Sequence, residues 1–233
     1  MRADWFAGLG LAALCLLPDS AGAVPRFAVQ QGAGCSLCHA NPTGGGARTD
    51  YGRGVYARQV LSMNLTFADE AVPLVDPTLG GNVAIGADLR AVYTHALPRA
   101  IVPDERALRE IGSFMLMQGD IYLTARLGSH VQIYFDQGTY GSQEIFARLI
   151  AGPVSLKAGK FMPAYGWRLP DHTAITRESI GFGPRARDTG VALVLDGVHH
   201  TIELGAFNGG GAEPFLDTDL RRAFAVRLVG RVG

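Results

Sequence analysis

Two cysteines and a histidine form the short pattern in this sequence that is best suited to specific chemistry. Cys35-Ser36-Leu37-Cys38-His39 has the form C-x-x-C-H. Two thiols three positions apart can reach the two vinyl groups of one porphyrin, and the imidazole of the next residue then lies under the iron as an axial ligand. The pattern therefore predicts one covalently attached c-type haem, held by Cys35 and Cys38, with His39 bound to the iron.

Other uses of two neighbouring cysteines fit this sequence less well. A thioredoxin-like pair expects a βαβ setting, whereas Gly- and Pro-rich sequence flanks this one. A structural zinc site expects a second pair of ligands, and no cysteine follows Cys38. A single disulfide between Cys35 and Cys38 is the remaining alternative, and the adjacent His39 favours haem over it.

The sixth position of the iron has several candidate ligands. Met63 is the nearest methionine after His39 and is the predicted distal ligand, although a core methionine at that place in a helix is an equal alternative. The alternatives among the histidines are His95, His130, His172, His199 and His200.

The first residues have the pattern of a secretory signal peptide. Arg2 precedes an apolar stretch from Trp5 to Leu17, and Ala21-Gly22-Ala23 is an A-x-A cleavage site. The prediction is a signal peptide over 1–23 and export of the chain, with Cys35 and Cys38 as the cysteines of the mature protein.

Composition limits the partners. Of 21 basic and 21 acidic residues, cleavage removes one and two, which leaves 20 and 19 and gives no reason to expect nucleic acid as a partner. No apolar stretch after the signal is long enough for a transmembrane helix. Short amphipathic membrane strands remain compatible with this composition, which includes 31 glycines.

The mature chain divides near residue 80. Residues 24–68 are predicted to form a monohaem cytochrome segment, in which Thr49 caps a helix from Asp50 to about Met63. Residues 69–81 contain two prolines and a Gly-Gly pair and are predicted to be a linker. Residues 82–233 form the β portion.

The β portion alternates apolar and polar residues with a period of two. This alternation predicts eight antiparallel strands. They cover Val83–His95, Met115–Leu127, Val131–Asp136, Glu144–Leu149, Val154–Ala158, Thr189–Asp196, Thr201–Phe207 and Arg222–Val232.

Alternation alone leaves two fold classes open. A soluble β domain buries the apolar face, whereas an outer-membrane barrel turns it to lipid. Long strands, opposed charges on successive polar faces, and short turns alternating with long loops favour the barrel. On that interpretation Leu89 and Leu123 face lipid, while Asp88 and Thr124 face the lumen.

The layout resembles the fused cytochrome–porin family of outer membranes. The similarity rests on the signal peptide, Phe27-Ala28, the C-x-x-C-H pattern, Tyr51-Gly52-Arg53 and the segment from Gly159 to Gly166 followed by Asp171-His172-Thr173. The resemblance implies electron transfer across or at the outer membrane through one covalent haem c, with a periplasmic carrier such as a soluble cytochrome as partner. Some members of the family take electrons from extracellular Fe(II), so the resemblance extends to iron oxidation.

One departure from that family concerns size. Its barrels have about twice as many strands, and an eight-stranded barrel is just filled by its own side chains and could not admit a haem segment. The expected structure is therefore an incomplete barrel, from the N-terminal part of a longer protein or from a truncated gene product. The alternative function is a soluble periplasmic c-type cytochrome whose β domain binds a partner or a ligand.

Overall fold

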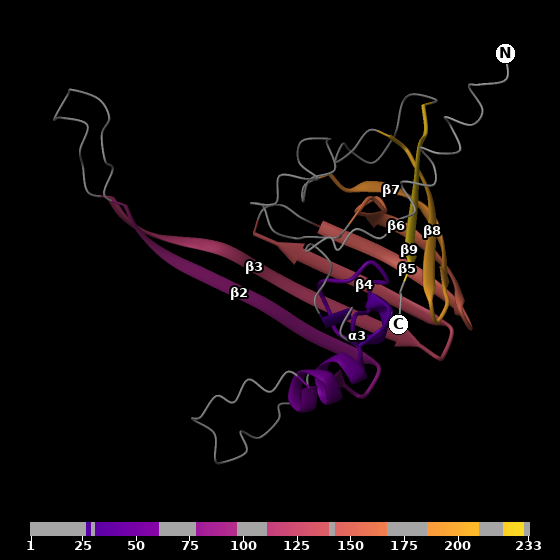
Figure 1. The fold of residues 1–233 in the computed structure, drawn as a ribbon, viewed down its shortest axis with the longest axis horizontal. Helices are drawn as coiled ribbons and strands as arrows, with labels where there is room; N and C mark the ends of the chain where they lie inside the picture. Colours follow the sequence, from indigo (N-terminus) through magenta and orange to yellow (C-terminus); the bar gives the residue numbers. More distant parts are fainter. Residues whose placement is uncertain are drawn as a thin grey trace, which may run out of the picture.

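The computed structural model describes residues 27–28, 31–60, 78–96, 111–139, 143–166, 186–209 and 221–230. Within these ranges the protein is mainly β, with one nine-stranded antiparallel sheet preceded by a short N-terminal helix (Figure 1). The strands pair in chain order from β1 to β9, so each strand from β2 to β8 is hydrogen-bonded to the strands before and after it in the sequence.

The elements have the following bounds. The helices are α3 (Cys35–Cys38) and η1 (Tyr51–Val60), the latter with π-type hydrogen bonding. The strands are β1 (Thr78–Leu79), β2 (Val83–Ala96), β3 (Ile111–Leu127), β4 (Val131–Gly138), β5 (Gln143–Ala151), β6 (Val154–Phe161), β7 (Asp188–Asp196), β8 (His200–Phe207) and β9 (Ala223–Gly230).

All eight strands predicted from alternation are confirmed. The strand ends differ from the predicted ones by up to four residues. The largest difference is at β3, which begins at Ile111, four residues before the predicted start, and whose additional residues pair with β2. The short strand β1 pairs with Val83 and Ala84 and falls within the predicted linker.

The β2–β3 hairpin is longer than its neighbours. β4 pairs with Asp120–Leu127 of β3, so the preceding half of β3 is paired with β2 alone. Figure 1 shows this part as a two-stranded arm that extends beyond the rest of the sheet. The outer half of the hairpin therefore lies apart from the curved body that holds the N-terminal segment.

The sheet curves around the N-terminal segment, so it has a concave and a convex face (Figure 1). The side chains of the concave face are buried and include many polar and charged groups. They are Tyr122, Thr124, Gln132, Tyr134, Asp136, Glu144, Phe146, Ser155, Lys157, Glu203, Phe207 and Arg227.

The convex face is apolar and exposed. Leu89, Phe224 and Leu228 are 80%, 78% and 71% exposed, and every long strand contributes residues of this kind. Leu89 is exposed on this face and Thr124 is buried on the other, as the alternation predicts. Leu123 is only half-buried, and Asp88 is exposed. Because soluble monomers rarely expose an apolar area that spans a whole sheet, this face marks an interaction surface.

A row of aromatic rings crosses the concave face. Tyr134 and Phe146 are stacked with centroids 4.7 Å apart, and Phe161 and Phe207 continue the row at 6.0 and 5.2 Å. Ala40 and Ala47 of the N-terminal segment belong to the same buried cluster. The segment after the C-x-x-C-H pattern therefore completes the core of the sheet.

The sheet is not closed into a barrel. Within the described residues β2 and β9 are its outer long strands, and they do not pair with each other. Among the helices in these ranges, none has the length and apolar content needed to cross a membrane.

Candidate functional site

The C-x-x-C-H pattern forms a single helical turn and the residue after it. Cys35 and Cys38 begin and end α3, so their side chains are one turn apart. His39 ends the turn in an extended conformation, and its backbone N–H donates to the Cys35 carbonyl oxygen at 2.9 Å. The three side chains of the predicted haem site therefore lie together at one end of one short element.

The two thiols are available for covalent chemistry. Cys35 and Cys38 are half-buried and are not joined in a disulfide. Burial raises the pKa of the Cys38 thiol, and the nearby Arg48 guanidinium opposes that rise. Since both sulfur atoms lie on one helical turn without a bond between them, the residues fit the attachment of a porphyrin by two thioethers.

A glycine-rich loop returns the chain beside α3. Gly44, Gly45 and Gly46 all have positive φ, a conformation that side-chain-bearing residues rarely adopt. A Cβ on Gly44 would lie 3.5 Å from the Cys35 sulfur, and a Cβ on Gly46 would overlap the Tyr134 hydroxyl. The loop therefore packs closely against the Cys35 side chain on one side and against the sheet on the other.

Glu144 anchors this loop to the sheet. Its carboxylate accepts from Asn41 Nδ2 at 3.3 Å and from the Met162 backbone N–H at 2.7 Å. Lys157 Nζ donates to Asn41 Oδ1 at 3.3 Å and lies 4.2 and 4.0 Å from the ring centroids of Phe146 and Phe161. Asn41, two residues after His39, is thereby held between a buried carboxylate and a buried ammonium group.

A second contact joins α3 itself to the sheet. The Ser36 hydroxyl, inside the C-x-x-C-H pattern, donates to the Asp196 carboxylate at the end of β7. Asp196 also accepts from the Thr201 hydroxyl at 2.7 Å. The helical turn is therefore fixed to β7 and β8, while the loop after it is fixed to β5 and β6.

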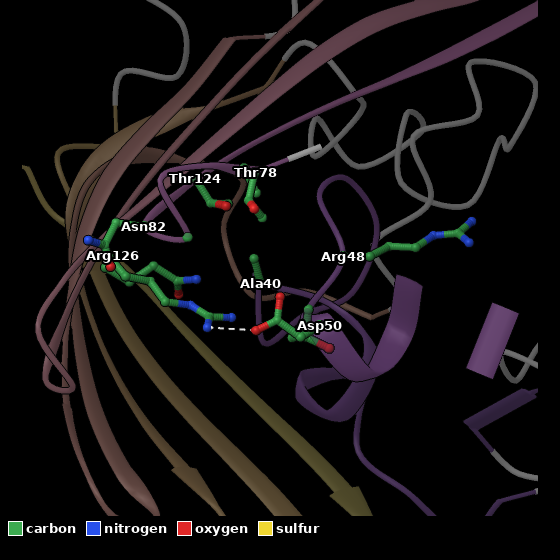
Figure 2. A pocket seen from close by; sticks show the side chains of 11 residues that line it. Ala40, Arg48, Asp50, Thr78, Asn82, Thr124 and Arg126 are labelled. Atoms are coloured by element: carbon green, nitrogen blue, oxygen red, sulfur yellow. Dashed lines mark hydrogen bonds and ion pairs between the residues drawn. The ribbon is translucent and has the colours of Figure 1, made fainter. Parts of the chain in front are cut away.

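A third contact lies in a narrow polar pocket that opens to solvent between the N-terminal segment and strands β1 to β4 (Figure 2). Arg126 Nη1 donates to Asp50 Oδ2 at 3.0 Å across it, and Arg53 Nη2 pairs with Asp50 Oδ1 at 2.7 Å. The hydrogen bond from Arg53, together with Arg126, lowers the pKa of the Asp50 carboxyl. This ion pair stabilises docking at neutral pH and is lost as the pH falls through the lowered pKa.

The predicted helix after Thr49 is present. The Thr49 hydroxyl accepts from the Gly52 N–H at 3.1 Å and donates to the Leu37 carbonyl oxygen at 2.6 Å, so it caps η1 and binds it to α3. Within η1, Tyr56 is buried and packs edge-on against Phe27 with centroids 6.0 Å apart. The cap and the helix confirm the sequence analysis as far as Val60.

Gly52 provides the first test of this packing. A Cβ there would lie 2.2 Å from the Cys38 carbonyl oxygen, whereas a Cβ on Gly54 would meet nothing within 4 Å. We expect Gly52→Ala to destabilise the segment by about 3 kcal/mol through overpacking, and Gly54→Ala to stabilise it by up to about 1 kcal/mol. Thermal unfolding and the haem-to-protein absorbance ratio measure both. Equal behaviour of the two variants would contradict the close packing of η1 on α3.

Glu144 provides the second test. Glu144→Leu removes the acceptor of two buried donors, so we expect a loss of about 2–5 kcal/mol of stability and faster proteolysis of the N-terminal segment. Gln137→Leu, at an exposed position on β4, is the control and should change stability by less than about 0.5 kcal/mol. Urea unfolding followed by circular dichroism gives both values. An unchanged midpoint for Glu144→Leu would show that the segment is held by other contacts.

The structure brings together only part of the predicted site. Cys35, Cys38 and His39 are adjacent, while Met63 and His172 lie outside the described residues. The other histidine candidates, His95, His130, His199 and His200, are exposed. Within the described ranges no group of three or more His, Cys, Asp or Glu side chains is placed to hold a metal ion.

The residues that position the segment were not among the predicted site residues. Glu144 and Lys157 lie within two of the predicted strands, and Asn41 follows the C-x-x-C-H pattern by two positions. The one signal in the sequence is a charged residue within an alternating strand, because such a charge needs a partner if it is buried.

The fold and the site together define a class: an open, mainly β sheet that holds a C-x-x-C-H turn against its polar concave face. No protein-family model, curated protein or solved structure matches this chain.

Proposed function

We propose that this chain transfers electrons across or at the outer membrane through one covalently bound c-type haem. The observation that carries the proposal is the C-x-x-C-H turn, seated against the polar concave face of a sheet whose convex face is apolar and exposed. In a water-soluble sheet the burial would be reversed, because its apolar face would form the core.

The haem site consists of three residues of this chain. Cys35 and Cys38 would hold the porphyrin by thioethers, and the His39 imidazole would bind its iron. Met63 is the proposed distal ligand. When bound, the haem supplies an iron that accepts and donates single electrons. The buried contacts of Asn41 and Ser36 fix this part of the chain relative to the sheet.

The two faces of the sheet have different roles in this proposal. The convex residues, such as Leu193 and Leu204, contact the hydrocarbon of the outer membrane. The concave polar groups line a lumen that contains the cytochrome segment. The sheet thereby holds an exported redox group inside the membrane, within reach of partners on either side.

The partners follow from that position. A periplasmic electron carrier such as a soluble cytochrome exchanges electrons on the inner side. Extracellular Fe(II) is the proposed donor on the outer side, and it rests on the family resemblance rather than on a metal site in the described residues.

Cell fractionation followed by redox titration tests this function. The chain is produced in an exporting, haem-maturing host, and we expect a haem-stained, detergent-extracted band in the outer-membrane fraction. Fe(II) added to the oxidised protein should produce the ferrous absorption spectrum. Recovery of the haem protein in the periplasmic extract without detergent would favour the soluble cytochrome instead.

The iron ligands give a separate prediction. We expect His39→Ala to lose the low-spin spectrum, because the proximal imidazole is removed. Met63→Ala should abolish the weak sulfur-to-iron band of the ferric protein and lower its reduction potential. Absorption spectra and potentiometry measure both effects, with Met115→Ala as the control for loss of a methionine. An unchanged spectrum in Met63→Ala would assign the sixth position to another group.

A further inference from the structure

We infer that Arg48 sets the reduction potential of the haem by holding a positive charge beside the iron ligand His39. The inference rests on the proposed haem function. Reduction adds one electron to the iron, so a fixed positive charge nearby stabilises the reduced form and raises the potential. Three properties of Arg48 support this role: its position opposite His39, the direction of its side chain, and the absence of a counter-ion among the described residues.

A short backbone ladder places Arg48 directly opposite His39. The glycine-rich loop reverses the chain, and the two residues then pair as an isolated antiparallel bridge. Backbone hydrogen bonds of 2.9 and 3.0 Å flank the pair on either side. The pair is therefore of the narrow type, in which the two Cα atoms are about 4.5 Å apart and the side chains leave the same face.

The side chain of Arg48 is exposed and lies close to the proposed attachment residues. Figure 2 shows it directed away from the ion pair between Asp50 and Arg126. Its guanidinium acts on the Cys38 thiol, whose charged form it favours. One cation thus lies near a proposed attachment residue and opposite the proposed iron ligand.

The charge of Arg48 has no counter-ion in the part of the chain that the structure describes. Its guanidinium makes neither a hydrogen bond nor an ion pair there. The nearest acidic residue in the sequence, Asp50, is already shared by Arg53 and Arg126. A carboxylate partner would cancel much of the field of an arginine, whereas an unpaired arginine acts on a neighbouring redox centre with its whole charge. Arg48 therefore makes the haem a better electron acceptor, which suits the proposed transfer from Fe(II).

Potentiometric titration of the haem protein tests this role. The full chain is purified with its haem from an exporting, haem-maturing host. Arg48→Gln should lower the equilibrium constant for reduction by about tenfold, which is about 59 mV for a one-electron couple. Arg48→Lys keeps the charge and should retain most of the wild-type potential. Arg90→Gln is the matched control and should change the potential little, because it removes the same charge from an exposed position in the β2–β3 arm.

Salt separates an effect of charge from an effect on packing. The Debye length falls from about 30 Å at about 0.01 M ionic strength to about 3 Å at about 1 M. The difference in potential between Arg48→Gln and the wild type should therefore shrink over that range. A difference that is the same at both ionic strengths would indicate a repacked haem site and would overturn the inference.

The outcomes separate this inference from the proposed function. A potential that is unchanged in Arg48→Gln, or that falls equally in Arg48→Gln and Arg48→Lys, would overturn the role of Arg48 and leave the haem assignment intact. An unmodified chain without attached haem would overturn both. If Arg48→Gln fails to retain haem, Arg48→Met, with a neutral unbranched side chain, gives a second measurement. Loss of haem from both neutral variants would overturn the inference and assign Arg48 to haem retention instead.

Discussion

Replacing both cysteines of α3 should remove the haem from the protein entirely. In Cys35→Ala with Cys38→Ala, neither thioether can form, so we expect no haem stain after denaturing electrophoresis. The single variants retain one thioether and should stain more weakly. The measurement is in-gel peroxidase staining of the exported protein, normalised to the protein band.

Ser36→Ala is the matched control, because it lies in the same turn and removes the contact with Asp196 but neither thiol. It should keep the full stain while loosening the N-terminal segment. A stain that persists in the double cysteine variant would show that the pattern is not an attachment site. A stain lost in Ser36→Ala as well would show that docking on β7 is needed for haem attachment.

The strands were predictable because alternation with a period of two is a local property of the sequence. The boundary of β3 was not, because Gly112, Ser113 and Phe114 lie in the arm, where both faces are exposed and no buried face imposes alternation. The short strand β1 has only two residues, too few for any period to appear.

The assignment of faces needed the structure. A soluble sheet and a lipid-facing sheet have the same alternation of apolar and polar residues. They differ only in which face of the sheet is buried. Lys157 and Glu144 are fully buried while Leu193 is exposed, which depends on the curvature of the sheet and on what fills it. Neither the curvature of the sheet nor the segment that fills its concave face can be predicted from a two-residue period.

The position of the C-x-x-C-H turn against the sheet could also not be predicted from the sequence. Asn41 and Glu144 are 103 residues apart, and Ser36 and Asp196 are 160 residues apart. Contacts of this kind leave no local pattern, whereas the thiol spacing within α3 does. Hence five residues suffice for the hypothesis of haem attachment, whereas the placement of the pattern against the sheet could not be predicted.

An arginine on the convex face should decide whether lipid covers it. Leu193 lies at the middle of β7, faces away from the N-terminal segment and is 44% exposed. In a membrane strand, Leu193→Arg places a charge near the centre of the hydrocarbon and should cost about 2–4 kcal/mol. On a soluble sheet the same exposed substitution should change stability by less than about 0.5 kcal/mol.

The control is Val198→Arg, which places the same charge at a 79% exposed position in the turn between β7 and β8. It should have little effect in either case, since a turn residue lies at or outside the hydrocarbon boundary. Reversible unfolding from lipid vesicles in urea gives both free energies. Because the two variants differ only in depth, a large difference between them requires a lipid-covered convex face, and equal small effects would identify a sheet that is exposed to water.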